Sequence, residues 1–245
     1  PEKSGGWRQA IRNHLNSYLG LFPVVAISSS LALSGVQQAM ASDDRPPADF
    51  LLEMIDPSLC LVPPADMSDA EIIAMLDSDD PEMAPPVSGT WRQGGAWQVA
   101  GQGNFNHGSN GLVASTELVL RHGDDRLRFL CLGLARHVDT YMTEGQADLV
   151  GPEVKAVSGD TFMVVALVGD RHDGAFVAEQ ELITERGTLS LTRVDEQAMT
   201  GSLTLEGRLE GQAPEAAVTL ELDLTELWHH DGMRVVDWDN EQLAE

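Results

Sequence analysis

Histidine and carboxylate side chains gather near the C-terminal end of the sequence, where they could hold a metal ion. His229, His230 and Asp231 are consecutive in the stretch LWHHDGMRVVDWDN. Imidazole nitrogens combined with a carboxylate form a donor set that suits zinc and related metals. Adjacent side chains point to opposite sides of a strand, however, and the spacing differs from the helical motif that places two histidines on one face. We therefore expect these residues to belong to a solvated tail. A metal-dependent hydrolase that uses all three residues is the alternative.

Other patterns that carry catalysis or hold a cofactor are not found in the sequence. The chain contains no Gly-x-Ser-x-Gly nucleophile elbow. The stretch GQGNFNHGSNG around His107 lacks the lysine and the following helix of a phosphate-binding loop, and it predicts a hairpin. Asp170, His172 and Asp173 fall in GDRHDGAF, where Asp-Gly also predicts a turn. We therefore expect no catalytic residue and no cofactor, and a protein that is not an enzyme.

The two cysteines allow two interpretations. Cys60 lies in DPSLCLVPP and Cys131 in LRFLCLGL. In an oxidising compartment they could form a disulfide that closes a long loop and stabilises the fold by about 3–4 kcal/mol. Their apolar surroundings instead favour two buried thiols that act as small hydrophobic residues. Neither cysteine has metal-ligand spacing.

An apolar run near the start of the chain predicts an export signal. A segment with two arginines precedes the run at 19–36, which contains a proline and several serines. The run is followed by Ala39, Met40 and Ala41, a small-x-small pattern at which cleavage would leave Ser42 as the first residue. We expect a periplasmic or secreted protein that is free of the membrane after cleavage. The alternatives are an uncleaved anchor at 19–36 and an ordinary core helix.

The charge balance excludes one class of partner. The chain has 39 acidic residues and 15 basic ones, for a net charge of −24. A polyanion of this size repels nucleic acid and anionic membranes, because its long-range field opposes their approach. Since the sequence has no basic stripe with interleaved aromatic residues, we expect no nucleic-acid binding.

The secondary-structure elements expected along the chain begin in a segment at 42–88 that is rich in proline and aspartate, which we call the preamble. Two short helices are expected there, the first over Ala48–Ile55. The second starts with a capping box formed by Ser68 and Glu71 and ends before Pro81. Its predicted apolar face is formed by Ile72, Ile73 and Leu76.

From Trp91 onward, β-branched and apolar runs separated by Gly, Asn and Asp turns predict strands. The later runs alternate with a period of two, which indicates a half-buried sheet, whereas TFMVVALV at 161–168 is apolar on both faces and is expected at the centre. The predicted fold is an antiparallel β-sandwich of about eight strands over 89–228, with a closed β-barrel as the alternative, followed by an acidic tail at 229–245. The expected strands are 96–105, 112–121, 126–134, 161–168, 176–184, 188–194, 202–209 and 217–224.

These features predict an exported, non-enzymatic β-protein with a binding or envelope-structural role. A barrel that binds a small apolar ligand is the alternative, with Trp91 and Trp97 near its mouth, although tryptophans at strand starts more often fill a core. The partner is expected to be a protein or a small ligand of unknown identity. The stretch GTLSLTRVDEQAMTGSLTLEG has a strand–turn–strand pattern typical of exported bacterial β-domains in general, and it identifies no family.

Overall fold

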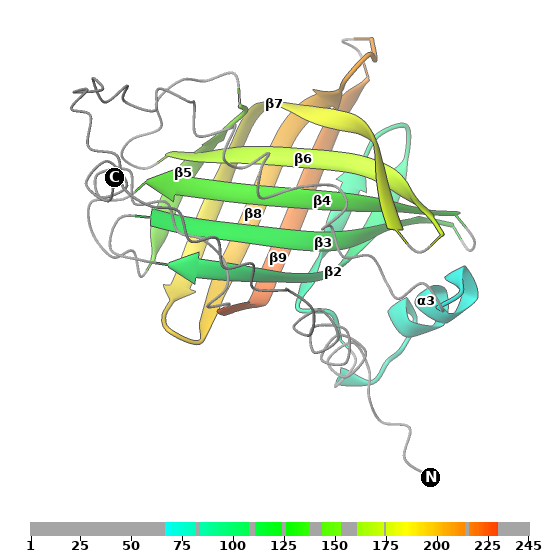
Figure 1. Ribbon diagram of the computed structural model, residues 1–245, viewed down its shortest axis with the longest axis horizontal. Helices are drawn as coiled ribbons and strands as arrows, with labels where there is room; N and C mark the ends of the chain where they lie inside the picture. The colour runs from blue at the N-terminus through cyan, green and yellow to red at the C-terminus, as the bar shows by residue number, and fades with distance from the viewer. Residues whose placement is uncertain are drawn as a thin grey trace, which may run out of the picture.

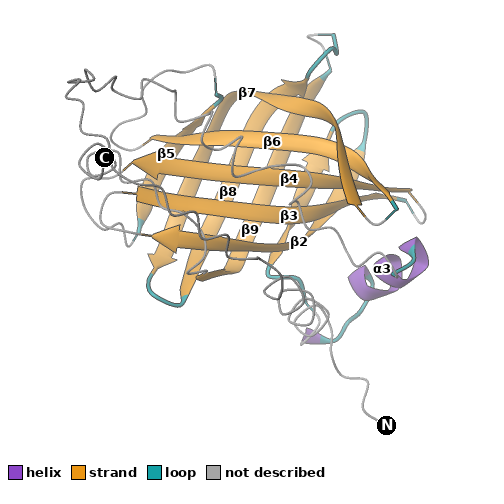
Figure 2. Ribbon diagram, viewed as in Figure 1, coloured by secondary structure: helices purple, strands orange, loops and turns teal. Residues whose placement is uncertain are grey.

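The computed structural model describes residues 67–81, 84–107, 111–123, 126–137, 144–152, 161–173, 175–213 and 216–229 of the 245-residue chain. The predicted signal peptide with Ala39, Ala41 and Ser42, the first preamble helix and residues 230–245 lie outside the described residues and stay predictions. The described part is dominated by strands (Figure 2). Its elements are α3 (Asp69–Leu76), β1 (Val87–Arg92), β2 (Ala96–His107), β3 (Gly111–His122), β4 (Arg126–His137), β5 (Gly145–Val150), β6 (Thr161–His172), β7 (Ala175–Val194), β8 (Ala198–Leu209) and β9 (Ala217–His229).

The nine strands form one sheet that closes into a ring. The order is β1-β2-β3-β4-β6-β5-β7-β8-β9, and β1 closes the ring because it pairs with both β2 and β9. In Figure 1, β2, β3, β4 and β6 lie in front of β8 and β9, which run in a different direction. The mainly-β prediction is confirmed. The antiparallel sandwich is not confirmed, because the sheet is a single ring and is mixed: β5 pairs with β6, and β2 with β9, in parallel.

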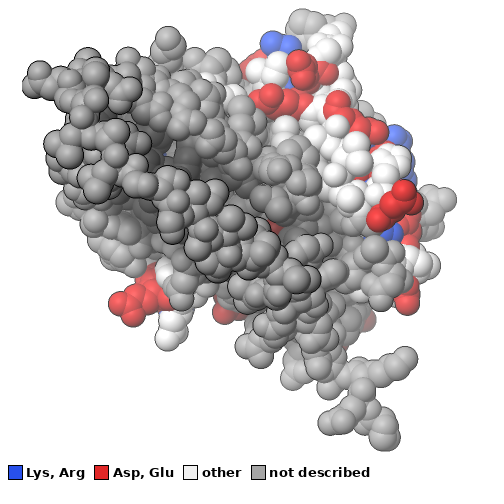
Figure 3. All heavy atoms as spheres, in the orientation of Figure 1, with Lys and Arg blue, Asp and Glu red and all other residues white. Residues whose placement is uncertain are grey.

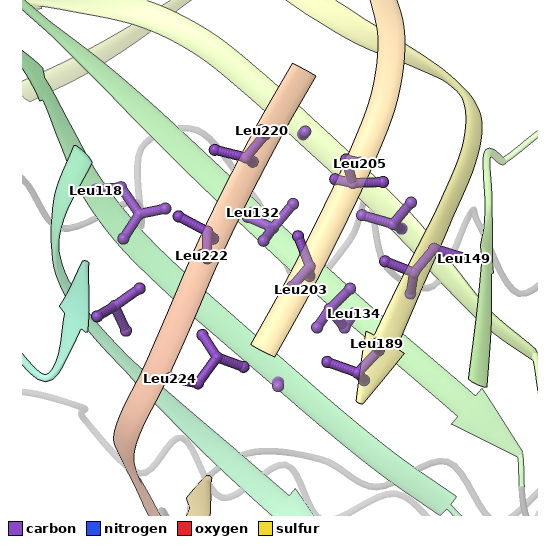
Figure 4. Packing of buried hydrophobic residues seen from close by; sticks show 14 of the residues in the cluster. Leu118, Leu132, Leu134, Leu149, Leu189, Leu203, Leu205, Leu220, Leu222 and Leu224 are labelled. Atoms are coloured by element: carbon purple, nitrogen blue, oxygen red, sulfur yellow. The ribbon is translucent and has the colours of Figure 1, made fainter. Parts of the chain in front are cut away.

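The interior of the ring is filled by apolar side chains that alternate along each strand. On β9, for example, Leu220, Leu222 and Leu224 are at most 2 % exposed, while Glu221 and Asp223 between them face solvent. Leucines from β3 and β4 belong to the same cluster as leucines from β8 and β9 across the ring (Figure 4). Period-two alternation therefore positions this core, as the sequence predicted.

A second apolar cluster lies on the outside of the ring, over β3, β4 and β6. We call this surface the covered face; its buried strand residues include Val113, Val119, Phe129, Cys131, Ala135, Met163 and Val165. Ile72 and Met75 of α3 pack into the same cluster. The central position expected for TFMVVALV is confirmed, because β6 pairs with β4, β5 and β7 and buries residues on both its faces.

Helix α3 begins at the predicted capping box. The Glu71 backbone N–H donates to Ser68 Oγ at 3.3 Å, and the Ser68 N–H donates to Glu71 Oε2 at 2.8 Å. The Ser68 hydroxyl donates to the same carboxylate oxygen at 2.7 Å, and the bonds from the Ser68 N–H and hydroxyl lower the pKa of the Glu71 carboxyl group. The helix ends at Leu76, but Met75 is buried alongside Ile72, whereas Ile73, expected on the apolar face, is only half-buried.

Two arginines on the ring hold α3 at one end of the covered face. Arg171 on β6 donates to Asp69 at 2.9 Å, and Arg121 on β3 donates to Asp77, which lowers the pKa of that carboxyl group. Among the residues that the structure describes, no helix is long and apolar enough to span a bilayer.

Candidate functional site

The opposite outer face of the ring, over β1, β7, β8 and β9, is polar and exposed or half-buried. Serines and threonines occupy the positions between the inward-pointing leucines. We call this surface the hydroxyl face; it consists of Ser88, Thr90, Thr188, Ser190, Thr192, Thr200, Ser202, Thr204 and Thr219. Hydroxyl groups both donate and accept hydrogen bonds, so this face is a broad hydrogen-bonding surface.

Strand register aligns these side chains into rows across the sheet. Thr188 on β7 pairs with Thr204 on β8, which pairs with Glu221 on β9, which pairs with Thr90 on β1. Because directly paired residues share a face and lie about 5 Å apart, each row is continuous. A second row consists of Ser190, Ser202, Asp223 and Ser88. On the neighbouring strand β5, Asp148 pairs with Thr188 and extends the first row, and Gln146 pairs with Ser190 and extends the second row.

Carboxylates make the hydroxyl face rich in acceptors. Arg92 donates to Glu221 at 2.8 Å, and Arg186 donates to Glu206, which raises the pKa of that guanidinium. These pairs are exposed to solvent, so each contributes little to the stability of the fold. Asp148 and Asp223 have no ion-pair partner within the described part of the chain. Figure 3 views the molecule from the side of β2, β3, β4 and β6, and the described surface visible there also carries acidic side chains beside basic ones.

The turn from β7 to β8 fixes one end of the hydroxyl face. Backbone N–H groups of Ala198 and Gln197 donate to Asp195 Oδ1 at 3.0 and 2.9 Å. These two bonds, together with the Arg193 guanidinium, lower the pKa of Asp195 to about 2. The chain therefore turns sharply and returns as a paired strand, as the stretch DEQAMTG predicted.

The residues suggested as a metal site are only partly described. His229, at the end of β9, packs edge-on against the Phe105 ring at a centroid distance of 5.4 Å, and its backbone N–H donates to the Gln197 carbonyl oxygen at 3.2 Å. His230 and Asp231 lie outside the described residues. Within the described ranges, no group of three His, Cys, Asp or Glu side chains is placed to hold a metal ion.

The two cysteines are also described in part. Cys131 is 2 % exposed and lies on the covered face. It is disulfide-bonded, so it is not one of two buried free thiols as the local sequence favoured. Cys60 lies outside the described residues.

The remaining candidates have structural roles. Asp170 lies 3.9 Å from Arg128, His172 is the last residue of β6, and Asp173 follows in the β6–β7 turn with a φ of 50°. Trp91 is 2 % exposed inside the ring, which confirms that it fills the core. Trp97 is partly buried and stacks on the His122 ring, with the two ring centroids 4.9 Å apart.

Sequence reasoning did not single out the hydroxyl face, although its signal was present. The alternation of leucine with threonine and serine at 188–192 and 202–206 indicates a wet face. What the sequence could not supply is the register that places those hydroxyl groups in rows with carboxylates from β5 and β9.

Comparison of this chain with protein-family models, with curated proteins and with solved structures finds no significant match.

Proposed function

We propose that the protein is an exported, non-enzymatic binding protein, and that its hydroxyl face contacts a partner protein rich in lysine and arginine. The observation that carries this proposal is the pair of polar rows across β7, β8, β9 and β1, which present hydroxyl groups next to carboxylates. Such a surface accepts more hydrogen bonds than it donates. Cationic side chains are the donors that complement it best.

The packing of the ring supports binding at the surface over binding inside. Leu118 and Leu132 from β3 and β4 share one cluster with Leu220 and Leu222 from β9 (Figure 4). Side chains from opposite walls thus occupy the space that an apolar ligand would need in the barrel alternative.

The electrostatics favour the same class of partner. A net charge of −24 attracts cationic proteins over long range and accelerates their association. Asp223 lies between Ser202 and Ser88 in register and has no ion-pair partner among the described residues. Its carboxylate is therefore available to an incoming lysine or arginine.

Two features support export. The segment at 1–41 has the pattern of a signal peptide. Cys131 is disulfide-bonded, and disulfides persist mainly in oxidising compartments outside the cytosol. Recovery of the protein outside the cytosol with Ser42 as its first residue is the expected result, and a cytosolic protein with an uncleaved N-terminus would contradict this part of the proposal.

Capture from envelope extracts tests the binding surface. The double variant S202K/T204K places lysines beside Asp223 and Glu221, so it reduces the negative charge of both rows. We expect the wild-type chain to retain a basic protein that high salt releases, and S202K/T204K to lose it. Val177→Lys is the matched control, because Val177 is 43 % exposed and lies outside the hydroxyl face. Equal retention by the wild type and S202K/T204K would show that the hydroxyl face is not the binding surface.

A further inference from the structure

Buried side chains of the covered face extend from Phe129 to Met163, yet α3 reaches only one end of this face. Val165 is 1 % exposed and Met163 is 0 % exposed. The ion pair that anchors α3 on β6 is at Arg171, eight positions from Met163, which is about 26 Å along a strand. An eight-residue helix spans about 12 Å. Another segment must therefore lie over Met163.

A covalent bond marks the middle of this face. Cys131 lies on the register row between Glu117 on β3 and Leu167 on β6, and it is disulfide-bonded. The chain contains two cysteines, so Cys60 is the other half of any disulfide within the chain.

The segment around Cys60 is apolar enough to pack on the covered face, and the chain between Cys60 and α3 is long enough for Cys60 to reach Cys131. Nine positions separate Cys60 from Asp69, the first residue of α3, and extended chain of that length reaches about 30 Å. Cys131 is four positions along β4 from Leu127, the register partner of Arg121, which binds α3 at Asp77. The tether is therefore long enough. The apolar residues in the segment are Phe50, Leu51, Leu52, Met54, Ile55, Leu59, Leu61 and Val62.

We propose that residues 48–62 are the occupant of the covered face, fastened to it by a Cys60–Cys131 disulfide. An apolar sheet face is stable only when another element covers it, and this segment supplies apolar side chains next to the one available cysteine. The bond forms by exchange with a disulfide oxidant such as oxidised glutathione. The two protein thiols give up two protons and two electrons, and the oxidant becomes two thiols.

The first test maps the bond in the full-length wild-type protein purified under oxidising conditions. Non-reducing digestion and mass spectrometry are expected to give one cross-linked peptide pair that contains Cys60 and Cys131. Alkylation of both thiols without prior reduction would overturn the proposal. This result is independent of the proposed function, because it involves neither the hydroxyl face nor a partner.

The second test uses two methionines that are both 0 % exposed, Met163 on the covered face and Met199 inside the ring. Hydroxyl-radical footprinting of the wild type is expected to leave both protected. In the variant L51D/L52D, the charged segment no longer fits the apolar face, so oxidation of Met163 should rise several-fold while Met199 stays protected. Glu53→Gln is the matched control in the same segment, and it should match the wild type.

The Met199 signal reports whether the ring stays folded. If Met199 becomes reactive in L51D/L52D, the comparison is repeated on wild-type protein with and without a reductant, which needs no substitution. Reduction should then increase the oxidation of Met163 selectively. The assignment of 48–62 as the occupant would be overturned if Met163 were equally protected in the wild type and in L51D/L52D. Where the reduction comparison is used, equal protection of Met163 before and after reduction would overturn it.

Discussion

The two outer faces of one ring have opposite chemistry. Over β3, β4 and β6 the outward positions include Val, Phe, Cys, Ala and Met side chains that are buried together. Over β7, β8 and β9 the outward positions are Ser, Thr and charged residues, and they face solvent. Both faces are built on the same alternation, and both enclose the same leucine core. The difference shows that side chains on one outer face are buried beneath a further layer, whereas those on the other face are accessible to solvent, where we propose that a partner binds.

The strongest test of this contrast places the same charge on each face. Val165→Lys puts an ammonium group on the covered face, where the native side chain is 1 % exposed. We expect a loss of about 3 kcal/mol or more in the free energy of unfolding, because a buried charge without a partner is strongly destabilising. Thr204→Lys on the hydroxyl face should change it by less than about 0.5 kcal/mol. Urea unfolding measures both, and similar effects would remove the distinction.

A second test asks whether the covered face is packed as tightly as the interior. Met163→Ala and Met199→Ala remove the same side chain from two sites that are each 0 % exposed. Each should cost about 2–5 kcal/mol if both sites are close-packed. Thermal or chemical unfolding measures both losses in the free energy of unfolding. A negligible loss for Met163→Ala beside a full loss for Met199→Ala would show that the side chains on the covered face are loosely packed.

The docking of α3 gives a smaller effect. Ser68→Ala removes the oxygen that accepts from the Glu71 N–H, and such a loss typically costs about 1 kcal/mol. Hydrogen exchange should show faster exchange of the α3 amides, with little change in β8. Ser202→Ala on the hydroxyl face is the control, since it should leave α3 unaffected. Unchanged α3 exchange in Ser68→Ala would show that the capping box does not stabilise the helix.

The smallest effect concerns pH at the β7–β8 turn. The pKa of Asp195 is lowered to about 2 in the folded protein, from about 3.9 in an unfolded chain. Its carboxylate therefore stabilises the turn fully at pH values above the unfolded pKa, and this contribution is lost as the pH falls toward 2. The stability difference between wild type and Asp195→Asn should be constant near neutral pH and shrink below pH 4. An NMR titration of Asp195 with a midpoint near 3.9 would contradict the prediction.

Much of the strand content could be predicted from local pattern, and the exceptions have identifiable causes. The strands expected at 176–184 and 188–194 form one strand, β7, because a register shift at Thr184/Arg186 interrupts the alternation without ending the pairing. β1 was missed because it is short and contains Gly89. A Cβ at that position would lie 1.9 Å from the Glu221 carbonyl oxygen, so glycine is required there by the close approach of β9.

The candidate site was less predictable than the strands. The period-two alternation predicts that Thr188, Ser202 and Thr204 lie on the wet face; Ser202 and Thr204 are exposed and Thr188 is half-buried. Their alignment with Glu221 and Asp223 depends on the register between β8 and β9, which the β-bulge at Met199/Gly201 adjusts. Cys131 was expected to be buried, but its local sequence did not reveal that it is disulfide-bonded.

The sequence by itself determined where the chain alternates, which leucines point inward on β8 and β9, and where α3 begins. These properties depend on neighbours within a few residues, because the periods of strands and helices are local. The tertiary structure alone decided that β1 joins β2 to β9, that β5 lies between β6 and β7, and that one outer face is covered. Those choices depend on contacts between residues distant in the sequence, whose free energies no local pattern encodes.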